Sequence, residues 1–459
     1  MFVPVPVSGV RAGSGAASGG GTASRAASGR RLSWDVVRVA ALLLVVWFHS
    51  TWQAPLWHAE LAPRTFALGY PVGASLLLVV SGYFAAAAVR RQEPWRWWWG
   101  RLFRLLPAFW AAVLLTAFLS WEAAPVGWWV PAWSDVGANV LMLWQWKPQL
   151  YPYVDASHWT IPIQLVAFTG VLAVCRRPWR RVPGVALLWA ALVFEVALWP
   201  ERVYGGSEPF RMFYDGLGWY RMHLFVAGVA VYAVASGRIG RAHGALLVVA
   251  CVAAHQLQVL DATTTVGVAA GLLVIVAAAV GPDWDGVVPS AAQPVIRWLA
   301  GISYGVYLTH QTLGDIVMRH LQDAGFGPFA QTVGMLATGV LFGWLVTVAV
   351  ERPAYRALCR LRDRWTGVRA VRADGSAGTG RAAASAGVAP VAVTLVEPAG
   401  PVAAVTLVKP VRSAAAVEVV KPVRLVKPGE TAGSVKLVKP ARSAESARRL
   451  ELSGRRESP

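Results

Sequence analysis

The sequence has few charged residues and few cysteines. Charged residues make up 15% of its 459 residues, whereas they make up about a quarter of a typical soluble protein. The three cysteines, Cys175, Cys251 and Cys359, are too few and too scattered for a disulfide framework or a cysteine-based metal site, so we predict neither. The sequence also lacks a Walker-type glycine-rich loop beside its arginine clusters, which leaves a nucleotide hydrolase without support.

Apolar residues are abundant. They form 56% of the chain, the mean hydropathy is +0.47, and there are 24 Trp. Apolar runs near the membrane-spanning length of about 20 residues recur through the middle of the sequence, which is typical of a polytopic membrane protein. The formal net charge is +19, and about half of it belongs to the part from Arg360 onward. Basic flanks are expected of membrane proteins, so this charge does not predict nucleic-acid binding.

The apolar runs predict an all-α bundle of about ten transmembrane helices. They lie at 35–54, 66–89, 102–120, 159–175, 184–199, 219–236, 244–260, 263–281, 297–319 and 330–351. The stretch 134–146 is short and carries Asp135 and Asn139, so we expect it to be re-entrant or interfacial. An even number of spans places both termini on one side of the membrane.

The distribution of arginine predicts on which side of the membrane the termini lie. The joints that face the cytoplasm if the N-terminus is inside are arginine-rich, and the opposite joints hold few arginines. By the positive-inside rule, both termini are cytoplasmic. We therefore expect a multi-pass protein of the plasma membrane.

The chain divides into three parts by composition. Residues 1–33 form a Gly-, Ser-, Ala- and Arg-rich arm, which we expect to be disordered because it cannot bury enough apolar surface. Residues 34–360 form the membrane domain. Residues 361–459 form a low-complexity tail in which Val-, Lys- and Pro-rich units recur. Its prolines favour extended, solvated conformations, as a spacer or as a basic segment on anionic lipid.

Two ionisable residues of the first span lie on one helical face. Arg38 and His49 are eleven residues apart, which is three turns plus roughly 20°, with a rise of about 16 Å. They outline a polar path from the inner surface to a buried imidazole. His49 is either a hydrogen-bonded core histidine or a general base, since its unperturbed pKa suits removal of a proton from a hydroxyl. Arg38 has the simpler alternative of pairing with Asp35.

A second arginine pair opens the third span. Arg101 and Arg104 are spaced i, i+3, which places two guanidinium groups side by side and suits them to phosphate oxygens. The alternative is a positive-inside anchor with an aromatic belt.

Three further patches contain polar groups within apolar segments. Ser81-Gly82-Tyr83 interrupts the second span, where a small residue is more often a packing contact than a site. Residues 302–310 place hydroxyl groups and the His310 imidazole along one helix. Glu351 ends the last span, and we expect it to pair with a nearby arginine.

Taken in order, these segments resemble the acyltransferase-3 family of integral-membrane O-acyltransferases. The resemblance covers about 35–355. The matching motifs are Asp35…Arg38 with His49, Val79-Val-Ser81-Gly82-Tyr83, Arg101-Leu-Phe-Arg104-Leu-Leu-Pro107, His158-Trp159-Thr-Ile-Pro-Ile-Gln164, Ser303-Tyr304-Gly-Val-Tyr307-Leu-Thr-His310 and Glu351-Arg352-Pro353.

The resemblance implies an enzyme that moves an acyl group, expected to be acetyl, from cytoplasmic acyl-CoA to a hydroxyl of a glycan, glycolipid or secondary metabolite. The acyl-CoA is a co-substrate, and no bound cofactor or metal is implied. By the resemblance, His49 is the catalytic residue, while Arg38, Arg101 and Arg104 bind the donor. The supporting residues are Asp35, Ser81, Gln164, Tyr304, His310 and Glu351.

The sequence departs from the family pattern at Gln164, where the family usually has Glu. Glutamine hydrogen-bonds but cannot take a proton or balance a positive charge at neutral pH. Either that acid is structural, or this chain handles its acceptor differently.

Two other classes of function remain open from the sequence. A transporter would use the intramembrane Arg and His as a substrate or proton path, but it would normally show two matching halves, and we find no such internal symmetry. A non-catalytic scaffold of the cell envelope would work through the tail and would not need His49.

Overall fold

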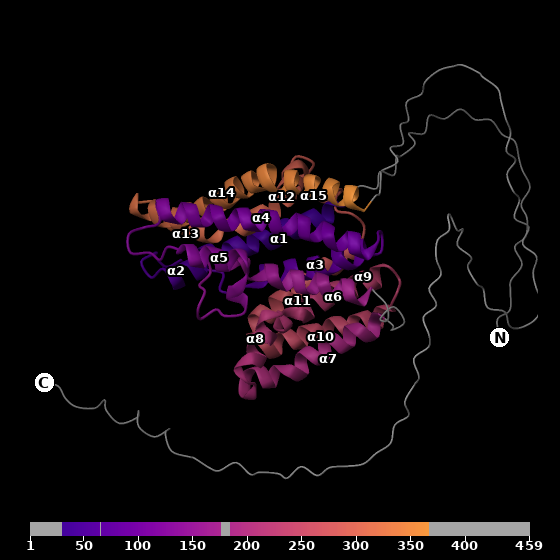
Figure 1. Cartoon of the computed structure of the whole chain (residues 1–459). Coiled ribbons are helices and arrows are strands. Elements are labelled where there is room, and N and C mark those ends of the chain that lie inside the picture. The colour runs from indigo at the N-terminus through magenta and orange to yellow at the C-terminus, as the bar shows by residue number, and fades with distance from the viewer. Residues whose placement is uncertain (1–29, 65, 176–183, 367–459) are drawn as a thin grey trace, which may run out of the picture. The chain divides into compact units, whose positions relative to one another are not determined.

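The computed structural model describes residues 30–64, 66–175 and 184–366, and Figure 1 shows their arrangement. These residues form helices joined by loops and turns, without a strand among them. The prediction of an all-helical fold is therefore confirmed. The two predicted tails fall almost entirely outside the described residues. So do the arginines predicted to face the cytoplasm between Arg176 and Arg181.

The helices follow one another closely along the chain. The longer ones are α1 (Leu32–Phe48), α3 (Val72–Val89), α4 (Pro94–Ala123), α6 (Thr160–Val174), α7 (Gly184–Pro200), α9 (Met222–Ala235), α10 (Arg241–Val259), α11 (Ala262–Val280), α12 (Gln293–Thr309), α13 (Gln311–Asp323), α14 (Pro328–Val346) and α15 (Arg352–Trp365). The shorter ones are α2 (Ala54–Trp57), α5 (Trp133–Val140) and α8 (Glu208–Gly216). Two π-helical turns, η1 (His49–Gln53) and η7 (Thr347–Glu351), continue α1 and α14.

Eight helical segments of the described chain are long and apolar enough to cross a membrane, and a ninth exists if the bent pair of α8 and the segment Trp219–Ala235 is one span. The chain is thus a multi-pass membrane protein. The ninth predicted span, 297–319, is divided at His310 into α12 and α13, and neither half reaches 18 residues. The stretch 134–146 forms only the short helix α5 and a 3-10 turn.

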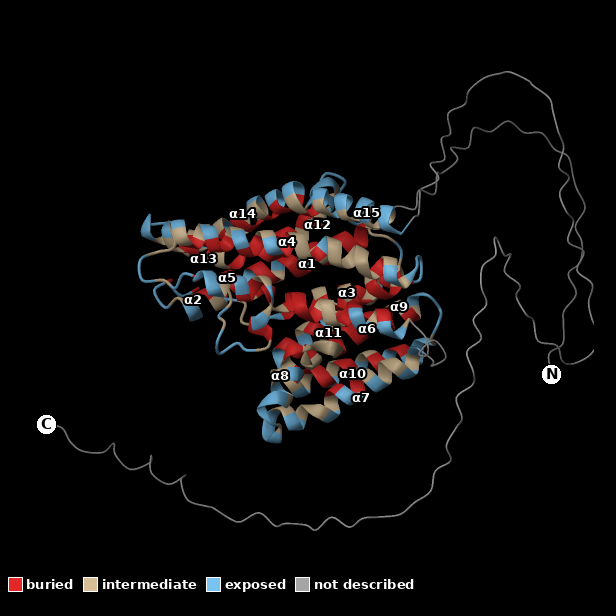
Figure 2. Ribbon diagram, in the orientation of Figure 1, coloured by how far each residue is buried: buried red, intermediate tan, exposed pale blue. Residues whose placement is uncertain are grey.

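Helix α1 lies at the centre of the packing. It contacts α3, α11 and α12, and its residues belong to both of the larger hydrophobic clusters, one with α3 and α9 and the other with α4 and α12. Two-thirds of its apolar window is buried, against 11% for the window that contains α7. Figure 2 shows the same contrast between α1 and α7. Polar side chains of α1 therefore face protein.

Glycine permits a close contact between α3 and α9. On α3, a Cβ atom at Gly82 would lie 2.4 Å from the carbonyl oxygen of Phe225 on α9, and one at Gly228 would lie 2.0 Å from that of Val79. Two helices can approach this closely only where side chains are absent, as in membrane helix pairs generally. The prediction that the small residues beside Ser81 form a packing contact is confirmed at Gly82.

The start of α1 is fixed by the loop after α11. The carboxylate of Asp283 accepts hydrogen bonds from the backbone N–H groups of Leu32 and Ser33, at 2.9 and 2.8 Å. Burial alone would raise the pKa of Asp283, but the N–H groups of Ser33, Leu32 and Trp284 outweigh it and lower that pKa below its usual value. Arg31 donates to the carbonyl oxygen of Gly281 at 2.6 Å. These bonds satisfy N–H groups that a helix start leaves without partners.

Candidate active site

The first turns of α1 carry a buried carboxylate between two arginines. Asp35 is fully buried and accepts a hydrogen bond from Nε of Arg30 at 2.7 Å. Its Oδ1 lies 3.8 Å from a guanidinium nitrogen of Arg38, so the pairing with Asp35 that the sequence leaves open as an alternative for Arg38 is present. Arg38 also lies over the ring of Phe84, 4.5 Å from the ring centroid. Asp35 and Phe84 together hold the Arg38 guanidinium in place.

Helix α4 carries the second arginine pair, Arg101 and Arg104. Arg101 donates to the carbonyl oxygen of Phe84 at 3.1 Å and lies over the ring of Phe168. No carboxylate among the described residues pairs with it. Arg104 donates to Glu351 at 3.1 Å, which confirms that Glu351 pairs with an arginine. The remaining guanidinium N–H groups of Arg101 are therefore available to an anion.

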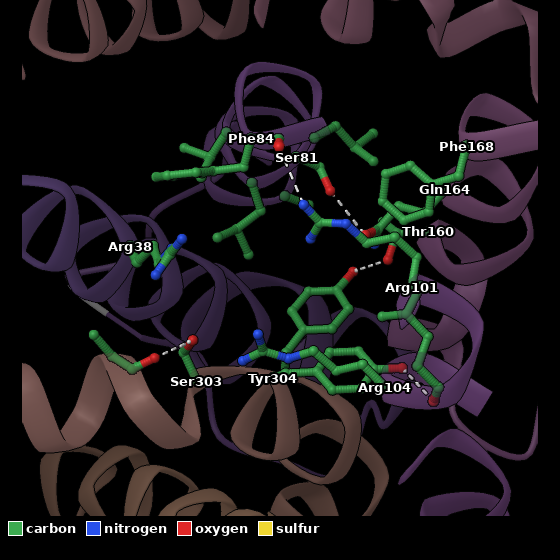
Figure 3. A pocket seen from close by; sticks show the side chains of 17 residues that line it. Arg38, Ser81, Phe84, Arg101, Arg104, Thr160, Gln164, Phe168, Ser303 and Tyr304 are labelled. Atoms are coloured by element: carbon green, nitrogen blue, oxygen red, sulfur yellow. Dashed lines mark hydrogen bonds between the residues drawn. The ribbon is translucent and has the colours of Figure 1, made fainter. Parts of the chain in front are cut away.

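The three predicted donor-binding arginines line one cavity of about 170 Å³. Figure 3 shows the side chains of Arg38, Arg101 and Arg104 around it. No carboxylate belongs to its lining. Apolar and hydroxyl-bearing side chains form the remaining walls: Ala74, Leu77, Leu78, Val80, Ser81, Phe84, Leu105, Thr160, Gln164, Phe168, Ala300, Ser303, Tyr304 and Tyr307.

A second cavity, of about 430 Å³, adjoins the first. The two share Arg38, Arg104 and Ala300 in their linings. The second cavity adds Arg30 and Arg352, and Glu351 is its one carboxylate. The linings of the two cavities together contain five arginines. Such a concentration of guanidinium groups favours a ligand with several negative charges.

Three of the predicted supporting residues also border the first cavity. The Ser81 hydroxyl donates to Oε1 of Gln164 at 2.9 Å. The Tyr304 hydroxyl donates to the carbonyl oxygen of Leu105 at 2.9 Å. Gln164, where the family usually has an acid, is thus a neutral acceptor bound to Ser81 on the cavity wall.

His49 lies close to this cavity but does not line it. It is 7% exposed, and its Nδ1 lies 2.9 Å from Nε2 of His310. Neither histidine belongs to the lining of either cavity. Tyr307 lines the first cavity, and its carbonyl oxygen lies 2.9 Å from Nδ1 of His310. The polar path predicted from Arg38 to His49 therefore stays a prediction: Arg38 lines the cavity, and His49 is linked to the cavity wall through His310 and Tyr307.

One buried polar cluster was missed by the sequence reasoning. Glu195 on α7 is fully buried, and its carboxylate contacts Nδ1 of His223 at 2.7 Å and accepts from Gln258 at 2.7 Å. Nε2 of His223 contacts Nδ1 of His255 at 3.0 Å. The signal was present in the sequence, since Glu195 is an acidic residue within an apolar run.

A model of an acyltransferase domain matches residues 31–348, about two-thirds of the chain. The chain belongs to the acyltransferase-3 family. It is therefore a membrane acyltransferase, and the match extends from the residue before α1 into η7. No curated protein and no solved structure matches the chain significantly.

Proposed function

We propose that this acyltransferase-3 protein moves a short acyl group, in the simplest case acetyl, from cytoplasmic acyl-CoA to a hydroxyl of a glycan, glycolipid or secondary metabolite. The observation that carries the proposal is the pair of adjoining cavities lined by Arg30, Arg38, Arg101, Arg104 and Arg352. Coenzyme A carries a pyrophosphate and a further phosphate, and guanidinium groups bind phosphate oxygens with paired, charge-assisted hydrogen bonds.

The sizes of the cavities fit a division of the donor between them. The larger cavity contains four of the five arginines and would receive the nucleotide phosphates. The inner cavity, at about 170 Å³, is smaller than the roughly 300–1,000 Å³ of sites that enclose drug-sized ligands. A short acyl group on the narrow end of the coenzyme suits that space better than a long chain does.

His49 is the proposed general base. Nδ1 of His49 contacts His310, and no hydrogen-bond partner of its Nε2 lies among the described residues. An imidazole nitrogen with a free lone pair can take the proton of an acceptor hydroxyl. For His49 to reach a thioester in the first cavity, the last turn of α12, which carries Tyr307, must shift when the substrates bind.

Both termini are proposed to be cytoplasmic, with the arginine-lined cavities opening to that side of the plasma membrane. Support comes from the arginine distribution along the sequence and from the position of the larger cavity beside Arg30, just before α1 begins. A donor made in the cytoplasm would then enter directly.

Mass spectrometry of the lipids, glycans and secreted metabolites of cells with and without the protein tests the proposal. We expect an acyl-sized mass increase on a hydroxyl-bearing compound, absent from cells that express His49→Ala at the same level. His58→Ala is the matched control, since His58 directly follows the helical segment that contains His49 and lines neither cavity. A profile that is the same in cells with the wild-type protein and in cells without it contradicts the proposal.

A further inference from the structure

Two buried histidine rings lie edge to edge beside the cavity. Nε2 of His310 is 2.9 Å from Nδ1 of His49, and the ring planes are within 12° of each other. The ring centroids are 4.9 Å apart. In this nearly coplanar arrangement, the N–H of one ring points along the lone pair of the other, as a hydrogen bond requires.

The position of one proton in this pair follows from a backbone contact. Nδ1 of His310 lies 2.9 Å from the carbonyl oxygen of Tyr307. A carbonyl oxygen only accepts hydrogen bonds, so Nδ1 of His310 carries a hydrogen. If the ring is neutral, its Nε2 then holds a lone pair.

The second proton follows from the first. Since Nε2 of His310 is an acceptor, Nδ1 of His49 must be the donor in the contact between the rings. A neutral His49 then holds its lone pair on Nε2, the nitrogen without a partner among the described residues. Neutral rings avoid burying an unpaired charge, and no ion pair of a carboxylate with either ring occurs in the described chain.

We infer that His310 is a positioning residue that fixes the tautomer of His49, so that Nε2 of His49 is always the basic nitrogen. The Tyr307 carbonyl orients His310, and His310 orients His49. This inference rests on the proposed function of His49 as a general base. A carboxylate fills the same place in many hydrolases, whereas here a neutral imidazole does.

The proposed role accounts for the proton at each step of the reaction. Nε2 of His49 removes the hydroxyl proton as the acceptor oxygen forms a bond to the thioester carbonyl carbon. The C–S bond then breaks, and the same proton passes from Nε2 to the leaving sulfur. Throughout, Nδ1–H of His49 donates to His310, which stabilises the transient positive charge on His49.

The alternative is that His310 serves only to fill space and satisfy a backbone carbonyl. Two variants separate the roles. His310→Leu keeps much of the side-chain volume but removes the acceptor for Nδ1–H of His49. His310→Gln offers an amide oxygen near the position of the imidazole Nε2, so it can still accept that hydrogen bond.

The first test uses the full-length protein in detergent, labelled with ¹⁵N-histidine, and assigns the His49 signals by comparison with His49→Ala. We expect the wild-type ring to carry its proton on Nδ1 and not on Nε2. We expect the same tautomer in His310→Gln and a loss of that preference in His310→Leu. A wild-type His49 protonated on Nε2 overturns the inference, and this outcome needs no active enzyme and neither His310 variant.

The second test measures release of the coenzyme A thiol from acetyl-CoA. The acceptor is the fraction that the protein acylates, taken from cells that lack the protein so that its hydroxyl is free. We expect His310→Leu to lower kcat by about 10- to 100-fold with KM for acetyl-CoA within twofold, and His310→Gln to recover most of the loss. An unchanged kcat in His310→Leu overturns the inference while the proposed function stands. If the wild type releases no thiol, the proposed function fails, and the ¹⁵N spectra still decide the tautomer.

Discussion

Replacing Arg101 by Ala should weaken the binding of coenzyme A without unfolding the protein. Arg101 has no carboxylate partner among the described residues, and its one hydrogen bond goes to the Phe84 carbonyl oxygen. Its remaining N–H groups are free to bind a phosphate. A hydrogen bond to a charged group contributes roughly 1.5–3 kcal/mol, and we take the lower part of that range because the cavity is open to water. The dissociation constant should therefore rise about 10- to 30-fold.

Isothermal titration of the purified full-length chain with coenzyme A measures this change, and no acceptor is needed. Arg96→Ala is the matched control, because Arg96 lies on the same helix, pairs with Asp363 at 3.0 Å and lines neither cavity. Arg101→Lys should lose less, since it keeps the charge but not the planar fork. Pantetheine, which lacks the phosphates, should bind the wild type and Arg101→Ala equally. Equal affinity of Arg101→Ala and the wild type for coenzyme A would refute the reasoning.

Three further predictions concern the membrane domain. Gly82→Ala should lower the free energy of unfolding by about 1–3 kcal/mol, because the added Cβ would meet the Phe225 carbonyl oxygen. Gly170→Ala is the control and should not lower it, because Gly170 on α6 faces open space. Equal melting temperatures of Gly82→Ala and the wild type would contradict the packing argument. Asp283→Ala should lower the free energy of unfolding by about 1 kcal/mol at neutral pH. Since the pKa of Asp283 is depressed in the folded protein, the wild type should lose this contribution as the pH falls through that pKa. Equal melting temperatures of Asp283→Ala and the wild type at pH 7 would argue against it. Removing the chain after residue 366 should leave coenzyme A affinity unchanged, and a large loss in the same titration would place donor binding partly in the tail.

Much of the fold could be predicted from the sequence because apolar runs and their interruptions report directly on membrane helices. Nine of the ten predicted spans correspond to continuous helical segments of the described chain. The ninth, 297–319, does not form a single helix, since the chain breaks at His310 between α12 and α13. Hydropathy alone cannot detect such a break, because His310 is buried and makes tertiary hydrogen bonds that a window average does not contain.

The candidate site was predictable in its residues but not in its connections. Helical spacing placed Arg101 beside Arg104, and both do line the cavity with Arg38. Spacing along α1 also placed His49 on the face of Arg38, but it could not show that His49 lies outside the cavity lining and contacts it through His310 and Tyr307. The contact of His310 with His49 joins residues 261 positions apart, and no local pattern reports a contact at that separation.

The most direct test of the central claim is acyl transfer by the purified protein in lipid vesicles, measured as coenzyme A thiol release. The acceptor is the unacylated fraction from cells that lack the protein. The account predicts that His49→Ala lowers kcat by about 100-fold or more, while its dissociation constant for coenzyme A stays at the wild-type value, since His49 lines neither arginine cavity. Transfer at the wild-type rate by His49→Ala would contradict it.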